Sequence, residues 1–536
     1  MTRQGLARAA GVAALMVVVS AIDAHPSTAS SRRAGQLTGS DALVRVYDLI
    51  LNARFEEADA DLKHACGPST TTGSAPSPSI EARPAPPEAC DVLAATATWW
   101  RILLDPESRG LDGPFTREVD AAIEATEAWA AREPDNAEAH FYTGAAYAAR
   151  VQWRVLRDEK VAAARDGKRI KQALERAIAL DPELEDAYFG IGLYQYYADV
   201  APAAAKVLRF LLMLPGGDRT EGLAQMQRAR SQGRLLQGEA DYQLQILYLW
   251  YEHRADLAVE LLESLHERYP GNPLFPAQLA EVRDRYQHDI TASLDTWRDL
   301  LHASRSGEVN ESVLAEVQAR LGMARQFEAL HQTDRAIEQL REVLQAKPAR
   351  PAGAYAEAAL ALGAGEDRLG HRDAALAAYR LAIASTPAPD AQHVRQRATE
   401  RMRHAPDAAR AEAYRLSLEG LRRLEKGDAA AAESLLARSL ALDPKDLVAR
   451  YRYGRALEAT KDEAAALAAF EETIRFAQDC PAPIAASAYL DAARLHERLA
   501  HTQQAIDYYR AASAWFGGAA ATHASARHAL ARLRAQ

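Results

Sequence analysis

The sequence predicts an all-α fold, a right-handed superhelical solenoid built from antiparallel helix pairs. The chain has 536 residues, well beyond a single domain of about 100 to 200 residues. One packing pattern recurs along it at near-regular intervals, which is typical of stacked repeats. No stretch shows the alternation of β-branched and polar residues that half-buried strands require.

The repeated pattern places a small, a large and an apolar residue twelve, eight and four positions before a proline. It occurs at Ala336, Leu340, Leu344 and Pro348, at Ala375, Tyr379, Ile383 and Pro387, and at Ala432, Leu436, Leu440 and Pro444. A second small residue lies twelve positions before each alanine, at Ala324, Gly363 and Gly420. Small residues let two helices approach closely, and each proline ends the second helix because it has no N–H to donate. Gly370 and Gly427 are expected to end first helices in the left-handed conformation.

This layout resembles the tetratricopeptide repeat family, whose unit is a helix-turn-helix of about 34 residues. The distance from Ala432 to Ala466 is 34 residues, and about nine such units fit between Ser40 and Phe516. The resemblance implies a solenoid whose first helices line a concave groove. It implies no chemistry, because every matching residue is a packing residue.

Departures from the repeat divide the chain into segments. We expect a signal peptide over residues 1–24, a flexible linker over 25–39, an irregular N-terminal array over 40–303, a regular C-terminal array over 311–516 and a capping helix over 517–536. The N-terminal array contains a Pro/Ser/Thr-rich loop at 67–89, expected to form no helix, and an apolar insert at 199–217. After the insert, Asp218 is predicted to cap a helix, with Glu221 closing a capping box. A second irregular stretch, from Ala388 to Ala409, is interpreted as a longer turn between repeats, with a hinge as the alternative.

The first residues have the features of a cleaved signal peptide. Arg3 and Arg8 precede an apolar run from Ala9 to Ala21, and cleavage is expected after Ala21 or Ala24. The run is too short for a membrane span, which needs about 20 apolar residues, and no later segment supplies one. We therefore expect a periplasmic or secreted protein without a direct membrane span.

Export would place the three cysteines in a compartment that permits disulfides. Cys66 and Cys90 flank the loop at 67–89, and we predict that they pair and tie the first helical hairpin to the next helix. Chain entropy for a loop of this size corresponds to roughly 3.5 kcal/mol. Cys480 has no obvious partner and is interpreted as a free structural thiol.

The charge pattern argues against nucleic-acid binding. The formal net charge is −9, whereas phosphate neutralisation requires a basic face. Basic residues do crowd one stretch, at Arg150, Arg154, Arg157, Lys160, Arg165, Lys168, Arg169 and Lys171. Because Asp158, Glu159 and Asp166 are interleaved with them, we interpret this stretch as a solvated helix face.

Signatures of catalysis are missing from the sequence. There is no His-Glu-x-x-His, Gly-x-Ser-x-Gly, phosphate-loop or Cys-x-x-Cys motif. His496 with His501, and His523 with His528, are five residues apart with no carboxylate near in sequence, and we interpret them as surface histidines rather than metal ligands. We therefore expect no enzyme, no cofactor and no metal site. An enzyme on a helical-repeat frame is the minor alternative.

Aromatic residues provide the candidate binding site. Counting from the packing positions places five of them at groove-facing positions, namely Phe189, Tyr196, Tyr197, Trp250 and Tyr251. Large rigid rings of this kind form binding hot spots. The alternative is that these rings are core around the apolar insert, because an error of one residue in register rotates a position by roughly 100°.

Two binding hypotheses follow from these observations. The first is an exported scaffold that binds a protein or peptide partner in its concave groove. The second is an envelope assembly or organising protein in which the apolar insert at 199–217 docks a membrane-bound partner.

Overall fold

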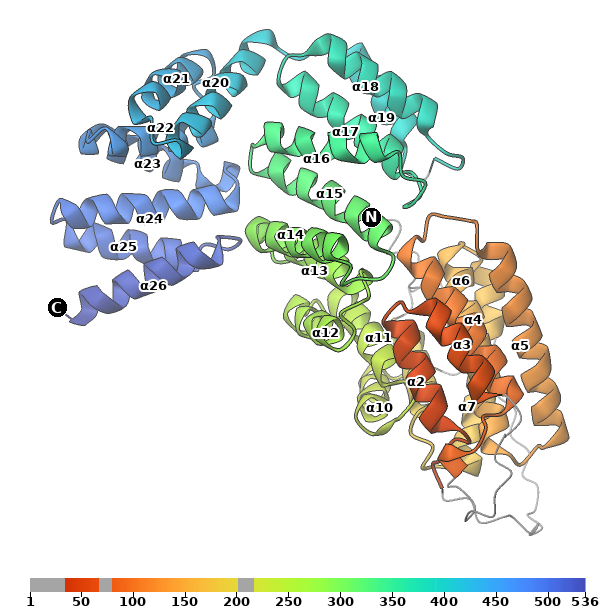
Figure 1. Ribbon diagram of the computed structural model, residues 1–536. Coiled ribbons are helices and arrows are strands. Elements are labelled where there is room, and N and C mark those ends of the chain that lie inside the picture. Colours follow the sequence, from red (N-terminus) through yellow and green to blue (C-terminus); the bar gives the residue numbers. More distant parts are fainter. Residues whose placement is uncertain (1–33, 67–79, 201–215, 391, 536) are drawn as a thin grey trace. The chain divides into compact units, whose positions relative to one another are not determined.

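A computed structural model describes residues 34–66, 80–200, 216–390 and 392–535. Regular structure in these residues is helical throughout, and no strand occurs among them. The chain divides into two compact units, Met1–Leu274 and Phe275–Gln536, called unit 1 and unit 2 below. The predicted all-α architecture of paired helices is confirmed (Figure 1).

Unit 1 consists of successive helix hairpins. Its elements are α2 (Ser40–Leu51), α3 (Phe55–Ala65), η1 (Ile80–Ala82), α4 (Pro87–Leu104), α5 (Asp112–Arg132), α6 (Ala137–Leu156), α7 (Lys160–Leu180), α8 (Ala187–Val200), α10 (Arg219–Gln232), α11 (Gln237–Trp250) and α12 (Ala255–Arg268).

Unit 2 continues with more regular hairpins. Its elements are α13 (Leu274–Arg285), α14 (Ile290–Ser306), α15 (Ser312–Ala329), α16 (Thr333–Ala346), α17 (Ala354–Arg368), α18 (Arg372–Ser385), α19 (Val394–Arg403), α20 (Ala408–Glu425), α21 (Ala429–Leu442), α22 (Leu447–Ala459), α23 (Glu463–Arg475), η2 (Ala477–Asp479), α24 (Ala482–Arg498), α25 (Thr502–Ala514) and α26 (Ala520–Ala535).

Prolines end the second helices at the predicted places. Five helices stop two residues before a proline, which are α7 before Pro182, α12 before Pro270, α16 before Pro348, α18 before Pro387 and α21 before Pro444. The turns inside the hairpins also match the prediction, because Gly370 and Gly427 have φ angles of 76° and 78°. At the same place in other hairpins, the left-handed conformation is adopted by His331 and Lys461.

Small residues lie where helices approach most closely. A Cβ atom on Gly363 would be 2.5 Å from the ring of Tyr379, and one on Gly420 would be 2.6 Å from Leu436. These are the small and large residues of the predicted pattern. The repeat found in the sequence is therefore the packing contact between the two helices of a hairpin.

The N-terminal segment departs from a nearest-neighbour array. The backbone N–H of Gly35 donates to the carboxylate of Asp181 at 2.7 Å, and Thr38 donates to Glu138 through its N–H and its hydroxyl at 2.7 and 2.8 Å. Residues 35–38, which we expected in a flexible linker, are thus held against helices far along the chain. Because hydrogen bonds to one buried and one half-buried carboxylate hold residues 35–38, this segment is part of the folded unit.

First helices of distant hairpins also meet inside unit 1. The rings of Trp100 on α4 and Tyr242 on α11 have centroids 4.9 Å apart. The side-chain amide of Gln243 on α11 donates to Gln152 on α6 at 2.9 Å. Unit 1 therefore closes on itself, so that α11 packs against helices that precede it by two or more hairpins.

The closed interior of unit 1 buries the carboxyl group of Glu239. This residue is 4% exposed and accepts hydrogen bonds from the hydroxyl of Tyr47 at 3.0 Å and from the amide of Gln243 at 3.2 Å. Burial raises the pKa of Glu239 above its ordinary value of 4.5, although these hydrogen bonds act in the opposite direction. Desolvation disfavours the charged form of a carboxyl group.

This shift predicts a pH dependence of stability. Because the pKa of Glu239 is higher in the folded protein than in the unfolded chain, its contribution to the free energy of unfolding is full below pH 4.5 and is lost as the pH rises through the raised value. Glu239→Gln cannot ionise, so its stability should fall less than that of the wild type over this window. Equilibrium unfolding at a series of pH values measures the two slopes. The exposed Glu267 of α12 supplies the control, since Glu267→Gln should keep the wild-type slope, and a wild-type slope in Glu239→Gln would contradict the prediction.

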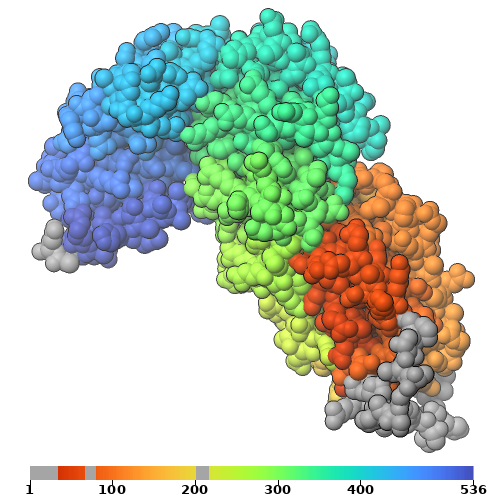
Figure 2. Space-filling view, in the orientation of Figure 1, coloured from red at the N-terminus to blue at the C-terminus, as the bar shows by residue number. Residues whose placement is uncertain are grey.

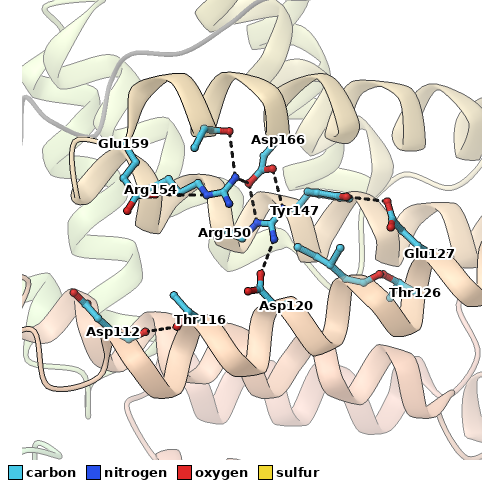
Figure 3. Close-up of polar contacts among 12 residues, drawn as sticks. Asp112, Thr116, Asp120, Thr126, Glu127, Tyr147, Arg150, Arg154, Glu159 and Asp166 are labelled. Carbon is cyan, nitrogen blue, oxygen red and sulfur yellow. Dashed lines mark hydrogen bonds and ion pairs between the residues drawn. The ribbon is translucent and has the colours of Figure 1, made fainter.

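The basic stretch on α6 and α7 is only in part a solvated helix face. Lys160, Arg165 and Arg169 are exposed as expected, whereas Arg150, Arg154 and Arg157 form ion pairs between helices. Asp166 is 5% exposed and binds Arg150 with two hydrogen bonds of 2.9 Å each. Arg154 also donates to Asp166, and Asp120 on α5 binds the far side of Arg150 (Figure 3). The acidic and basic residues that alternate in the sequence thus form ion pairs between α5, α6 and α7. Their spacing in the sequence does not reveal this pairing.

A second pairing fixes the end of the same stretch. Arg157, whose side chain is 4% exposed, makes three hydrogen bonds to Asp112 on α5, at 3.0, 2.9 and 2.7 Å. It also donates to the backbone carbonyls of Pro106 and Ser108 at 2.7 and 2.8 Å. These contacts anchor the loop between α4 and α5 to the end of α6.

Several segment boundaries differ from the expected ones. The chain divides into its two compact units after residue 274. Of residues 304–310, the first three belong to α14, and the others connect it to α15 through Gly307 with φ 76°. Residues Ala388–Ala409 contain the helix α19, so this stretch is neither a simple turn nor a hinge loop. Pro87 begins α4, so the loop predicted at 67–89 ends earlier than expected.

The cysteine prediction is confirmed. Cys66 follows α3, Cys90 lies in the first turn of α4, and the two are joined by a disulfide with a Cα–Cα distance of 6.5 Å. Cys480 is a buried free thiol, as expected. The predicted signal peptide at 1–24 and residues 201–215 of the apolar insert lie outside the described residues.

The helix after the insert is capped as predicted, except for one bond. Asp218 accepts hydrogen bonds from the backbone N–H groups of Thr220 and Glu221, both at 2.9 Å. The backbone N–H of Asp218 donates to Gln195 rather than to Glu221, so the capping box is not closed.

Candidate functional site: the groove of unit 2

Unit 2 contains a groove of about 1000 Å³. Its walls come from α17, α19, α20, the start of α22 and the turn between η2 and α24. These elements follow the curved path of unit 2 (Figure 1). Because elements from successive hairpins contribute to one surface, the groove can contact an extended segment along several repeats.

Polar side chains form the floor of the groove. The hydroxyl of Tyr414 on α20 is 2.9 Å from the hydroxyl of Thr333 at the start of α16. Thr333 also donates to Glu328 at 3.1 Å, and Glu328 forms an ion pair with Arg368. The ring of His331 lies 5.8 Å from that of Tyr414. Burial lowers the pKa of His331 and raises that of Glu328, so both groups are held away from bulk water.

A buried arginine supports this floor from beneath. Arg452 on α22 is 4% exposed and donates to the hydroxyl of Ser417 and to the backbone carbonyl of His331, both at 2.8 Å. It forms no ion pair with any residue that the structure describes, and burial lowers its pKa. The guanidinium group of Arg452 is therefore held beside the groove by uncharged oxygen acceptors. Because the group is buried, water screens its positive charge poorly.

Charged residues of both signs line the groove. The helix α19 contributes Arg397 and Arg401, which are exposed and form no ion pair with a described residue, and also Glu400. The turns that precede α22 and α24 contribute Asp443, Asp446 and Asp479, together with Lys445. Asp446 also caps α22 by accepting from the N–H groups of Val448 and Ala449, at 3.0 and 2.9 Å.

The polar groups of the floor contact one another. Acid-base catalysis needs a titratable pair directed at one reacting atom, and the polar groups of the floor are instead hydrogen-bonded to one another. Among the described residues, no group of three or more His, Cys, Asp or Glu side chains could hold a metal ion. In the same part of the chain, no helix has both the length and the apolar character needed to cross a bilayer.

One histidine pair is less exposed than we expected. His496 is 5% exposed, its Nδ1 is 3.2 Å from Nδ1 of His501, and its Nε2 is 3.3 Å from the carboxylate of Glu471. The interpretation of His496 as a surface residue was therefore wrong, because Glu471 on α23 approaches it from the neighbouring hairpin. The three side chains make a small polar cluster between α23, α24 and α25.

The aromatic residues predicted to bind a partner lie in unit 1. Phe189 and Tyr196 on α8 are 7% and 0% exposed, so their rings pack in the core between α8, α10 and α11. Tyr196, Tyr197 and Tyr251 form a group with ring centroids 5.6 to 5.9 Å apart. Tyr197, Tyr251 and Trp250 are half-buried. Partner binding by these three residues stays a prediction.

The groove of unit 2 was missed by reasoning from the sequence. Its most exposed wall, α19, lies in the irregular stretch Ala388–Ala409, which we interpreted as a turn. A signal was present, because four arginines occur in ten residues of α19, with a single acidic residue among them. Packing of the repeats does not require a basic helix between two regular hairpins. Such a helix therefore indicates a function other than packing.

The paired helices of the fold define a helical-repeat protein. Residues 423–490, from the end of α20 into α24, match the family model of the tetratricopeptide repeat. For this segment the resemblance to the tetratricopeptide repeat noted in the sequence is confirmed. Among curated proteins, none matches this sequence significantly.

Solved structures of repeat proteins match the chain at low sequence identity. The complex of the TPR2AB domain of yeast Sti1 with pHSP90 is 15% identical, with a TM-score of 0.21, over 56% of this chain and 99% of that chain. A tetratricopeptide repeat protein from Parabacteroides merdae is 16% identical, with a TM-score of 0.26, over 56% of this chain and 99% of that chain. The TPR domain of P58(IPK) is 15% identical, with a TM-score of 0.23, over 83% of this chain and 98% of that chain.

Proposed function

We propose that this protein is a non-catalytic scaffold and that the groove of unit 2 binds a segment of a partner protein or a peptide. The observation that carries the proposal is the groove of about 1000 Å³, which is walled by successive hairpins and open to solvent at α19. Tetratricopeptide repeats present extended concave surfaces of this kind for binding.

The side chains of the groove support a polar and sequence-selective contact. Arg397 and Arg401 offer guanidinium groups that form no ion pair with a described carboxylate, although Arg401 also interacts with the hydroxyl of Tyr379. Asp479 offers an acceptor in the same groove. A partner segment that places acidic groups toward α19 would gain charge-assisted hydrogen bonds. The hydrogen-bonded floor around Tyr414 stays fixed, so little ordering is needed on binding.

Site-specific crosslinking tests the position of the partner. A photo-crosslinking amino acid at position 397 or 401 should capture a discrete partner in the native host. The same amino acid at the exposed position 438 on α21 is the matched control, because it lies outside the groove. Equal capture from position 438, or none from the two groove positions, would remove this groove from consideration.

Charge reversal tests the contribution of α19 once the captured partner is purified. Arg401→Glu should weaken its binding about tenfold or more, because a hydrogen bond to a charged group is lost and a repulsive charge replaces it. Arg403→Glu, on the same helix but outside the groove lining, should leave the affinity within about twofold. Isothermal titration calorimetry measures both constants.

We also propose that the protein is exported. The support is the signal-like sequence at residues 1–24 and the pairing of Cys66 with Cys90, which suits an oxidising compartment. Fractionation of the host with an antibody against unit 2 tests this proposal, and a cytoplasmic protein that retains residue 1 would refute it.

A further inference from the structure

The hairpin of α2 and α3 lies on unit 1 like a bound ligand. Figure 2 shows this hairpin in red on the surface of the unit. The hydroxyl of Tyr47 donates to Glu239 on α11, and Asp48 accepts from the hydroxyl of Tyr269 after α12, at 3.0 and 2.8 Å. Asn52 accepts from the backbone N–H of Gly271 at 2.7 Å. One short segment therefore contacts sites that follow it by about 190 to 220 residues.

The contacts are those of a helix bound in a groove. α2 is amphipathic, with Leu43, Val46 and Ile50 fully buried on one face. Its polar residues meet matching groups on the rest of unit 1, and Gly238 on α11 accommodates the side chain of Leu51. An apolar stripe that supplies affinity and polar pairs that set the register characterise helix-in-groove recognition.

The surface beneath the hairpin combines two buried carboxyl groups with three arginines that pair with acidic residues of the hairpin, Arg234 with Asp41, Arg268 with Asp48 and Arg101 with Asp59. Glu138 is 1% exposed and binds Thr38, and Glu239 is 4% exposed and binds Tyr47. These carboxyl groups would regain water if the hairpin left. Such a surface selects a helix that carries hydroxyl or other donor groups at the same positions.

The disulfide controls how firmly the hairpin is attached. Cys66 and Cys90 are separated by 24 residues in sequence but are joined directly at the end of α3. The bond replaces a long connection with a short one, which raises the effective concentration of the hairpin at its site. Of the two cysteines, Cys66 is half-buried and Cys90 is buried.

We propose that the α2–α3 hairpin is a tethered ligand of unit 1, held by the Cys66–Cys90 bond, and that reduction of this bond frees the site for an amphipathic helix with the pattern of α2. A dithiol supplies the two electrons and two protons, so that both cysteines become thiols and the dithiol becomes a disulfide. This proposal does not depend on the groove of unit 2.

Hydrogen exchange of the full chain tests whether the hairpin is released. With dithiothreitol, the amides of α2 should exchange faster by up to roughly 300-fold, the factor that closure of a loop of this size contributes. Amides of α6 and α7 should keep their protection. Cys66→Ser/Cys90→Ser should behave like the reduced protein without any reductant, whereas Cys480→Ser, at the buried free thiol, should behave like the oxidised wild type. Unchanged exchange of α2 on reduction, or loss of protection in α6 and α7 together with α2, would overturn the proposal.

A peptide in solution provides the second measurement. A fluorescent peptide of residues 34–52 should bind the reduced full chain and the Cys66→Ser/Cys90→Ser variant, but not the oxidised protein. The same peptide with Thr38→Val and Tyr47→Phe should bind at least tenfold more weakly, since it lacks donors to Glu138 and Glu239. Binding that is equal in both redox states, or absent from both, would show that the hairpin is an integral part of unit 1.

Discussion

Asp166→Ala is expected to lower the free energy of unfolding of unit 1 by about 3 kcal/mol, because it leaves two largely buried arginines without their shared carboxylate. Asp166 is 5% exposed, while Arg150 and Arg154 are 16% and 21% exposed. Their guanidinium groups cannot turn fully into water without unpacking α6 from α7. Chemical denaturation followed by the exchange of α6 and α7 amides measures the loss.

The control for this prediction lies in the same network. Asp120 binds the other side of Arg150 but is 60% exposed. Asp120→Ala should cost less than about 1 kcal/mol, since an exposed ion pair contributes little. If the two variants lost the same stability, burial of Asp166 would not be the cause.

Gly222→Ala is expected to destabilise unit 1 by about 2 to 3 kcal/mol through overpacking. A Cβ atom at this position would lie 2.6 Å from the backbone nitrogen of Tyr196 and 2.7 Å from the carbonyl oxygen of Gly192. Both neighbours are backbone atoms of α8, so α8 and α10 would have to move apart. Thermal unfolding of the purified variant measures the effect.

A second helical glycine provides a control of opposite sign. Gly167 in α7 has no atom within 4 Å of the position that its Cβ would occupy. Gly167→Ala should therefore stabilise the protein by about 0.5 to 1 kcal/mol, because alanine loses less backbone entropy in a helix. Destabilisation by both alanines would show that close approach is not what Gly222 provides.

The sequence predicts those parts of the fold that depend on neighbouring hairpins. Gly363 and Tyr379 belong to one repeat, so their spacing reveals their contact, and Pro387 marks the end of the same hairpin. Contacts between α2 and α11 have no such signature. They join residues about 190 positions apart, and no period relates the two.

The same holds for the candidate sites: contacts within one hairpin could be predicted from the sequence, and contacts between distant hairpins could not. The position of an aromatic residue along a helix did not reveal that Tyr196 would be covered by α10 and α11. In the same way, Glu471 approaches His496 only after α23 and α24 have packed. For the groove of unit 2, composition could have singled out α19, but the polar floor depends on the approach of Thr333 to Tyr414, 81 residues later.

The contact between Asn52 and Gly271 has a consequence for the order of folding. The two residues are 219 positions apart, and a ribosome adds about 5 to 20 residues per second. Once made, α2 must therefore wait roughly ten to forty seconds for the residues that complete its site. During that interval only residues near in sequence can cover the apolar stripe of Leu43, Val46 and Ile50. We therefore expect chaperones to bind α2 before residues 269–271 have been made.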